Sequence, residues 1–241
     1  MPDIDGRFNY IYNSFKLIVI KGVLVSPRCY RSGRRKAATE ETRRKIVEST
    51  VDLHAEQGVL ATTYAMIAKR ADVAIPTVYN HFPTRGDLLA ACTSQAAALA
   101  PPLGPQNYNG ADDVDTRLQA LVHALFAYYR HYAPWMRWAN YEAQLVPELA
   151  EWLHEATDAR RQLTELALEP AFGTPPPAAL LALCEILLDY PAWQRLVSDQ
   201  GFESAEAETA LTDALTALVQ MHRTAFTAAG RRSKPRTERN T

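Results

Sequence analysis

Residues 43–89 constrain the fold of this chain more than any other segment, because they carry the pattern of three short helices with a tight turn between the last two. Apolar residues recur at helical spacing along the first helix, which should end near Gly58, since glycine tolerates the left-handed backbone of a helix end. The second helix should run to Arg70, and the third should span about 75–81. Two short helices with so brief a connection predict a helix-turn-helix.

Polar residues mark where these helices should begin. Thr39, which two glutamates follow, is expected to cap the first helix, because acidic side chains favour the positive end of a helix. Thr62 or Thr63 can cap the second helix, and Thr84 can cap a fourth helix that follows the third.

The packing requirements of a helix-turn-helix are also present. Ala68 is small where the two helices must approach closely. Asp72 occupies the turn, and aspartate adopts a left-handed conformation more readily than most residues. The expected apolar anchors are Ile67, Val73, Val78 and Phe82.

The third helix carries side chains suited to reading DNA. In a helix-turn-helix this helix lies in the major groove, where Thr77 can bond a base or phosphate, Pro76 can contact a thymine methyl and Asn80 can reach an adenine edge. Other polar side chains suit phosphate contacts. The predicted DNA-binding set is Thr62, Thr63, Pro76, Thr77, Tyr79, Asn80, His81 and Arg85. The alternative is an ordinary three-helix bundle, in which Tyr79 and His81 are packing residues.

The rest of the chain is also helical in pattern, so the expected fold class is all-α. Pro134, Pro147 and Pro176 each suit the first turn of a new helix, where a missing N–H does no harm. Helices are expected near 84–100, 112–132, 134–144, 147–169, 176–200 and 204–229.

The two ends of the chain lack this period. Residues 1–38 form an N-terminal extension that packs on the body, is disordered, or results from an upstream start codon, and these alternatives stay open. Its basic stretch 28–36 should be flexible, either as an arm for the minor groove or as a solvated tail. Residues 231–241 are expected to be a basic, disordered tail. The remaining domains are then 39–89, the helix-turn-helix domain, and 90–230, the helical body.

Charge is distributed unevenly along the chain. Residues 1–95 hold 14 Lys and Arg against 9 Asp and Glu, whereas residues 96–230 hold 7 against 17. A basic front and an acidic middle suit a chain whose two halves meet different partners. Charge alone does not decide the function, because an uneven distribution can also be incidental.

The sequence also predicts the cellular location. No apolar run approaches the roughly 20 residues of a membrane helix, and the N-terminus is a poor signal peptide. A cytoplasmic location without a membrane partner is therefore expected. The 3 cysteines are far apart and show neither disulfide nor zinc-site spacing.

Motifs of catalysis are missing from the sequence. It contains no Gly-rich phosphate loop, no His-Glu-x-x-His and no Gly-x-Ser-x-Gly. We therefore expect no enzymatic activity, no cofactor and no metal. The remaining rival is a helical protein-interaction module without DNA binding, which would lack the steep salt dependence of a DNA reader.

Residues 46–89 resemble the DNA-binding domain of the TetR family of transcriptional regulators. The resemblance lies in Gly58, Thr62-Thr63, Ile67-Ala68, Ala71-x-Val73 and Thr77-Val78-Tyr79-Asn80-His81-Phe82-Pro83, followed by Arg85 and Leu88-Leu89. The chain departs from the family at Asp72, Ala74, Arg85 and Gly86, where the family usually has Gly, Ser, Lys and an acidic residue. Ala74 is a weaker N-cap than serine by about 1 kcal/mol.

The resemblance implies a larger helical domain for ligand binding and dimerisation after the helix-turn-helix. Helices from roughly Thr84 to Phe172 would form a pocket, and the last two long helices would pair with a second subunit. The residues themselves also favour association between subunits. The predicted helix 176–200 is too apolar on all sides for a surface helix, and the predicted helix 204–229 carries an apolar stripe. Ordinary core helices of a monomer are the alternative.

An aromatic cluster in the middle of the chain is the candidate effector site. Aromatic walls with a few polar tips are typical of small-molecule pockets, and also of protein cores. The candidate residues are His123, Phe126, Tyr129, Trp135, Trp138, Tyr141 and Glu142. The pattern favours an aromatic or mostly apolar effector with a hydroxyl or positive group.

Together these features predict a homodimeric transcriptional regulator of the TetR type. It would bind a pseudo-palindromic operator in double-stranded DNA as a repressor, and a small-molecule effector would release it.

Overall fold

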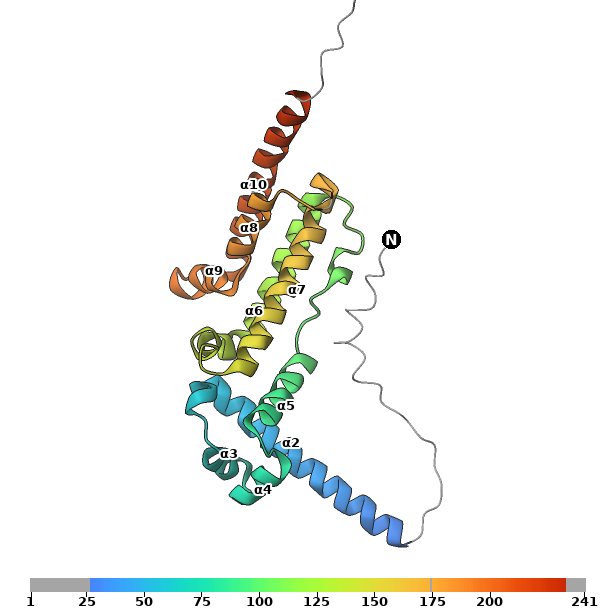
Figure 1. Cartoon of the computed structure of the whole chain (residues 1–241), viewed down its shortest axis with the longest axis vertical. Helices are drawn as coiled ribbons and strands as arrows, with labels where there is room; N and C mark the ends of the chain where they lie inside the picture. Colours follow the sequence, from blue (N-terminus) through green and yellow to red (C-terminus); the bar gives the residue numbers. More distant parts are fainter. Residues whose placement is uncertain (1–26, 174, 233–241) are drawn as a thin grey trace, which may run out of the picture. The chain divides into compact units, whose positions relative to one another are not determined.

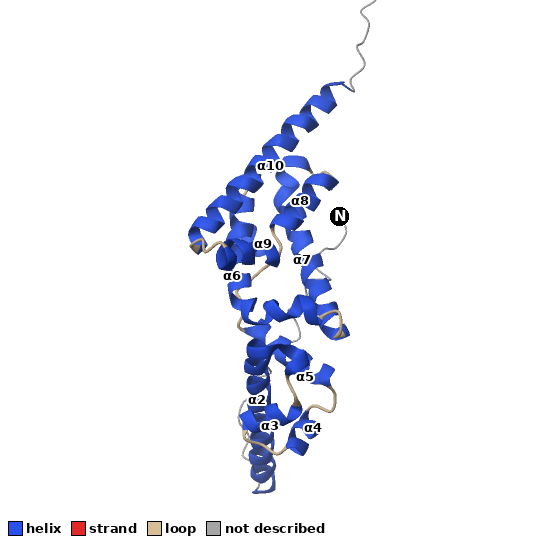
Figure 2. Cartoon of the chain, turned by 90° about the vertical axis from the view of Figure 1, so that its left-hand side faces the viewer, coloured by secondary structure: helices blue, strands red, loops and turns tan. Residues whose placement is uncertain are grey.

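The computed structural model describes residues 27–173 and 175–232, and all regular structure within them is helical (Figure 2). This confirms the predicted all-α class. The chain divides into two compact units, residues 1–42 and residues 43–241, and the second unit holds every site described below. None of the helices in the described part of the chain is long and apolar enough to cross a membrane.

Helix α2 (Pro27–Ala61) begins earlier than the sequence predicts. Thr39 does not cap the helix: it lies inside α2, where its hydroxyl donates to the carbonyl of Arg35 at 2.9 Å. The stretch 28–36, predicted to be flexible, belongs to the same helix. The residues just before Thr39 are Arg, Lys and Ala, which are good helix formers, so nothing there ends the helix. The predicted features of residues 1–26 lie outside the described residues.

Three short helices follow at the predicted positions. They are α3 (Tyr64–Ala71), α4 (Ile75–His81) and α5 (Arg85–Ala98). Thr63 caps α3 by accepting the N–H of Met66 at 3.3 Å. Thr84 and Asp87 form a reciprocal capping box at the start of α5. These helices share a core with α2, made of Ile46, Val47, Leu53, Ile67, Ala68, Ala71, Val78, Phe82, Leu88 and Cys92.

The larger part of the chain is built on two long helices. After a short 3-10 helix, η1 (Pro105–Tyr108), helix α6 (Val114–Glu142) packs against α7 (Pro147–Phe172), as Figure 1 shows. Pro147 stands at the predicted start of α7.

The predicted helix break at Pro134 is wrong, because α6 continues through it. Proline fixes φ near its helical value, so the main loss inside a helix is one N–H bond and some crowding. Tyr132, Met136 and Ala139 are buried on either side of Pro134, so packing holds both halves of α6 in line.

The single helix predicted at 176–200 is also wrong. The carboxylate of Asp189 accepts the N–H of Ala192 at 2.8 Å, and Pro191 stands in the first turn after this cap, so a new helix starts here. The chain instead forms α8 (Ala178–Leu187), α9 (Tyr190–Gln194) and the π-helical segment η2 (Arg195–Asp199), followed by α10 (Ser204–Arg232). Helix α10 packs against α6 and α8. Pro176 precedes α8 and is not part of its first turn.

Candidate nucleic-acid interface and the adjoining cavity

The turn between α3 and α4 has the geometry of a helix-turn-helix. Asp72 adopts φ 54° and ψ 51°, which is the predicted left-handed conformation. The N–H of Val73 donates to the carbonyl of Ala68 at 3.0 Å and closes the turn. Ala68 is 2% exposed and Val78 is 0% exposed, so the two helices meet through small and apolar side chains as the sequence predicts.

Helix α4 presents several of its predicted contact residues to the outside. Tyr79 is 53% exposed, and Pro76 and Asn80 are exposed as well. Thr77 and His81 are half-buried. Their contacts with DNA stay predictions.

The predicted residues outside α4 differ from one another. Thr63 and Arg85 are exposed. Thr62 is 6% exposed, and its hydroxyl donates to the carbonyl of Gly58 at 2.7 Å. The hydroxyl of Thr62 therefore also stabilises the connection between α2 and α3.

A hollow of about 370 Å³ brings four of the eight predicted DNA-binding residues together. Its lining includes Thr62, Thr63, Tyr79 and Arg85. Tyr64 also lines it, packs against Tyr79 with ring centroids 4.5 Å apart, and donates its hydroxyl to the carbonyl of Phe82 at 3.0 Å. Sequence reasoning missed Tyr64, although its place beside the Thr63 cap was a signal.

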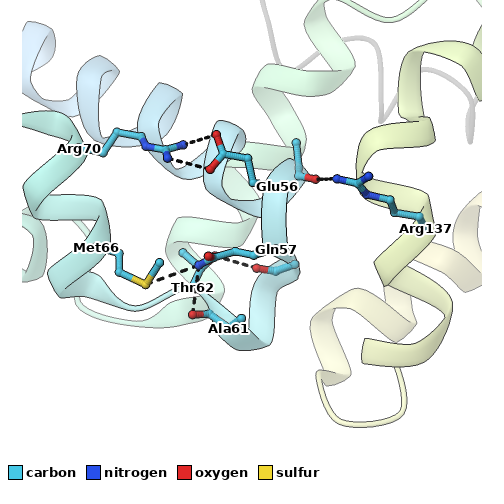
Figure 3. Close-up of polar contacts among 9 residues, drawn as sticks. Glu56, Gln57, Ala61, Thr62, Met66, Arg70 and Arg137 are labelled. Atoms are coloured by element: carbon cyan, nitrogen blue, oxygen red, sulfur yellow. Dashed lines mark hydrogen bonds and ion pairs between the residues drawn. The ribbon is translucent and has the colours of Figure 1, made fainter.

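Polar contacts fix α3 on α2, as Figure 3 shows. Arg70 and Glu56 form two parallel hydrogen bonds of 2.7 Å each. The amide of Gln57 donates to the carbonyl of Ala61 at 3.2 Å and lies 3.5 Å from the sulfur of Met66. The orientation of α3, and of α4 packed on it, therefore depends on the last turns of α2.

The same turns of α2 accept hydrogen bonds from α6. The indole N–H of Trp135 donates to the carbonyl of Val51 at 3.0 Å. The indole of Trp138 and the guanidinium of Arg137 both donate to the carbonyl of Ala55, at 3.2 Å and 2.5 Å (Figure 3 shows Arg137). We call these three bonds the α2–α6 clasp.

Glu142, at the end of α6, binds the backbone just beyond the clasp. Its side chain is 4% exposed, and its two carboxylate oxygens accept the N–H groups of Val59 at 2.8 Å and Leu60 at 3.0 Å. These N–H groups are free for Glu142 because Gly58 interrupts the helix with φ 85° and ψ 176°. A Cβ on Gly58 would overlap one of these carboxylate oxygens, so a side chain there would displace Glu142 from its N–H partners.

A cavity of about 60 Å³ lies between α2, α5, α6 and α7. Apolar and aromatic side chains form most of its walls, with Glu142 and His54 as the titratable groups other than the Cys92 thiol and the Tyr132 phenol. It is lined by Val51, His54, Gly58, Val59, Leu89, Cys92, Thr93, Ala96, Tyr132, Trp135, Trp138, Ala139, Glu142, Leu149 and Trp152.

Three of the seven predicted effector residues line this cavity, namely Trp135, Trp138 and Glu142. Phe126 and Tyr129 lie in the core of the body, 1% and 3% exposed, and the hydroxyl of Tyr129 donates to the carbonyl of Leu188 at 2.5 Å.

Two other predicted effector residues have exposed side chains. His123 is paired with Glu208 at 3.0 Å, and Tyr141 is 71% exposed. The effector role of all seven stays a prediction. Sequence reasoning missed Trp152, because nothing local connects α7 with a cavity beside α2.

His54 lines both the cavity and the hollow beside α4. Burial lowers the pKa of His54 to about 4, and the nearby positive charge of Arg85 lowers it in the same direction. His54 is therefore uncharged at neutral pH.

Comparison with known proteins places this geometry in a family. The family model described as "Bacterial regulatory proteins, tetR family" matches residues 46–92, which contain α3 and α4. Residues 46–92 therefore match the DNA-binding domain of the TetR family of bacterial regulatory proteins. The TetR-family match thus covers the part of the chain whose geometry is that of a helix-turn-helix.

Part of the chain is also similar to an individual transcriptional repressor. The HTH-type transcriptional repressor KstR of Rhodococcus jostii (strain RHA1) is 34% identical over 58 residues, which cover 24% of this chain and 27% of that repressor. The chain thus matches about a quarter of the length of this relative.

Solved structures of TetR-type regulators share the fold. A transcriptional regulator from Aquifex aeolicus VF5 aligns with a TM-score of 0.55 at 18% identity, over 73% of this chain and 99% of that one. A TetR-family regulator from Streptomyces coelicolor aligns with a TM-score of 0.53 at 22% identity, over 78% of this chain and 83% of that one. The likeness extends the TetR-type fold beyond the matched 46–92 into the helical body.

Proposed function

We propose that this protein is a sequence-specific DNA-binding transcriptional regulator, a repressor that a small-molecule effector releases from its operator. The observation that carries the proposal is the exposed face of α4 beside a polar hollow that gathers Thr63, Tyr79 and Arg85. Such a helix fits the major groove, and the flanking hydroxyl and guanidinium groups suit phosphates. The matched relative is a transcriptional repressor, which supports repression as the mode of regulation.

A homodimer is part of the proposal, because two reading helices are needed for two half-sites of a pseudo-palindromic operator. Leu183 and Ile186 lie three residues apart on α8 and are 42% and 63% exposed. Met221 on α10, which packs on α8, is 67% exposed. Exposed apolar side chains on two neighbouring helices support a self-association surface there.

The proposed role is regulatory and not enzymatic. An effector acts only if it binds the DNA-free conformation better than the DNA-bound one. The contacts of α6 with the end of α2 offer a physical connection between the helical body and the reading helices, because α3 is held on the same turns of α2.

The test is binding of the purified full chain to the DNA upstream of its own gene, with excess random DNA as competitor, over a series of salt concentrations. We expect protection of a pseudo-palindrome and a steep loss of affinity with rising salt, since several phosphates are contacted. Absence of binding to any DNA at low salt would overturn the proposal in favour of a protein-interaction module.

Two variants separate the expected roles on α4. Tyr79→Ala should weaken binding to operator and random DNA alike, because a phosphate contact carries no sequence information. Thr77→Ala should mainly reduce the preference for operator, by about 1–3 kcal/mol if a base contact is lost. Equal losses from both variants on every DNA sequence would contradict this division.

A further inference from the structure

Glu142 is a buried acid that none of the described side chains pairs with as a cation. Both of its carboxylate oxygens accept hydrogen bonds from neutral backbone N–H groups. Among the described residues, none of the ion pairs between side chains includes Glu142. His54 shares the cavity but is uncharged at neutral pH, because burial lowers its pKa to about 4. Buried charges are normally paired, so the Glu142 carboxylate suits a positively charged partner.

The walls beside Glu142 suit a cation of a particular kind. Tyr132, Trp135, Trp138 and Trp152 line the same cavity. The faces of tryptophan and tyrosine rings attract cations, and aromatic cages of this composition hold methylated ammonium groups. A strongly hydrated metal ion would find few oxygen ligands here, and an anion would meet the carboxylate. A neutral apolar ligand would leave the charge of Glu142 unbalanced.

The size of the cavity limits the group that enters. Its volume is about 60 Å³, smaller than the roughly 150 Å³ of an apolar cavity that admits benzene. A methylated ammonium group can therefore enter only if the side chains of the cavity wall move outward.

We propose that the cavity between α2, α5, α6 and α7 is a binding site for a small organic cation bearing apolar substituents, such as a methylated ammonium group. Glu142 supplies the counter-charge, and the rings of Trp135, Trp138 and Trp152 contact the apolar substituents.

Occupancy of this site acts on the end of α2. The cation and the N–H groups of Val59 and Leu60 share one carboxylate, and the Gly58 carbonyl beside them accepts the Thr62 hydroxyl next to the cap of α3. The site is therefore the effector site of the regulator, an assignment that rests on the proposed function.

The experiment is calorimetric titration of the full chain with choline and with its neutral carbon isostere, dimethylbutanol. The two probes have the same shape and differ in charge. We expect choline to bind wild type about ten-fold or more tightly than the isostere. Equal affinities for the two probes, or no binding of choline, would overturn the proposal.

Matched variants test whether the carboxylate of Glu142 provides the negative charge that binds choline. Glu142→Gln should weaken choline binding about ten-fold or more and leave the isostere unaffected, whereas Glu151→Gln, at an exposed position of α7, should behave as wild type. If Glu142→Gln does not fold, Trp152→Leu replaces it, because Trp152 lies on α7 outside the α2–α6 clasp. Choline binding unchanged in the folded variant would contradict the site.

Operator binding of wild type without a probe separates this inference from the proposed function. Choline binding without any DNA binding would support the cation site and contradict the proposed function as a DNA-binding regulator. Operator binding that choline does not weaken, together with choline binding, would overturn the effector assignment alone.

Discussion

His54 is an uncharged histidine between the cavity and the hollow beside α4, and its burial has a thermodynamic consequence. Its pKa is lowered from 6.5 to about 4 in the folded protein. The unfolded chain therefore takes up a proton more readily, so the free energy of unfolding is highest above pH 6.5 and falls as the pH drops toward 4. The loss amounts to roughly 3 kcal/mol at 1.36 kcal/mol per pKa unit.

We expect His54→Gln to remove this part of the pH dependence. Urea unfolding of both proteins between pH 6.5 and pH 4 measures it, and the difference between the two profiles isolates His54 from the carboxylates, which titrate in both. Parallel profiles for wild type and variant would show that His54 takes up its proton equally well in the folded state.

Gly58 illustrates a second constraint at the scale of one residue. Gly58 and Gly110 both have positive φ, 85° and 82°, but a Cβ meets Glu142 at 2.3 Å only at Gly58 and finds open space at Gly110. Gly58→Ala should therefore destabilise the protein by about 1–3 kcal/mol more than Gly110→Ala, because the buried carboxylate must leave its N–H partners. Comparison of the two unfolding free energies tests this, and equal losses would mean that Glu142 moves aside freely.

The surroundings of Gly58 also show which features could be predicted from the sequence and which could not. The positive φ at Gly58, the left-handed Asp72 and the Thr63 cap were predictable, because each depends on a few neighbouring residues. The partner of Gly58 was not predictable. Glu142 stands more than 80 residues away, and only the packing of α6 on α2 brings its carboxylate to Val59 and Leu60. The DNA contacts of α4 stay predictions, and sequence reasoning did not single out Tyr64 or Trp152.

At the scale of an element, prolines show why helix boundaries were predicted unevenly. Pro134 and Pro191 both suit the first turn of a helix, yet only Pro191 starts one. The difference is the cap: Asp189 accepts the N–H of Ala192, whereas Ala133 before Pro134 offers no capping side chain and Tyr132 is buried in the core. A proline thus predicts a helix start best when a capping side chain precedes it.

Helix α4 lacks such a cap, which gives a prediction of increased stability. Ala74 holds the N-cap position with an extended backbone, φ −71° and ψ 145°, and makes no side-chain bond. A serine hydroxyl there can accept the N–H of Thr77, so Ala74→Ser should raise the free energy of unfolding by about 1 kcal/mol. Urea unfolding tests the change. An unchanged value would indicate that the existing bond from Thr77 to the Ala74 carbonyl already satisfies this N–H.

At the scale of the whole molecule, two hydrophobic cores meet where α2 and α5 reach the body. One core holds the helix-turn-helix, and the other holds the long helices together with Val59 and Leu89. The α2–α6 clasp and Glu142 add polar contacts at the same place. These contacts offer a route by which a change in the body can reach α3 and α4, and each of them can be altered singly.

The proposed dimer gives the prediction that belongs to the assembled protein. Ile186 is 63% exposed on α8, and a charge there would have to be buried without a partner if two copies meet through this face. We expect Ile186→Glu to shift the protein from dimer to monomer in sedimentation velocity. Operator affinity should fall about 10²–10⁴-fold, because two linked reading helices gain that factor over one.

Leu145→Glu provides the control, since Leu145 is 65% exposed between α6 and α7, outside α8 and α10. Dimers that persist in Ile186→Glu, with operator affinity unchanged, would place the self-association surface elsewhere on the chain.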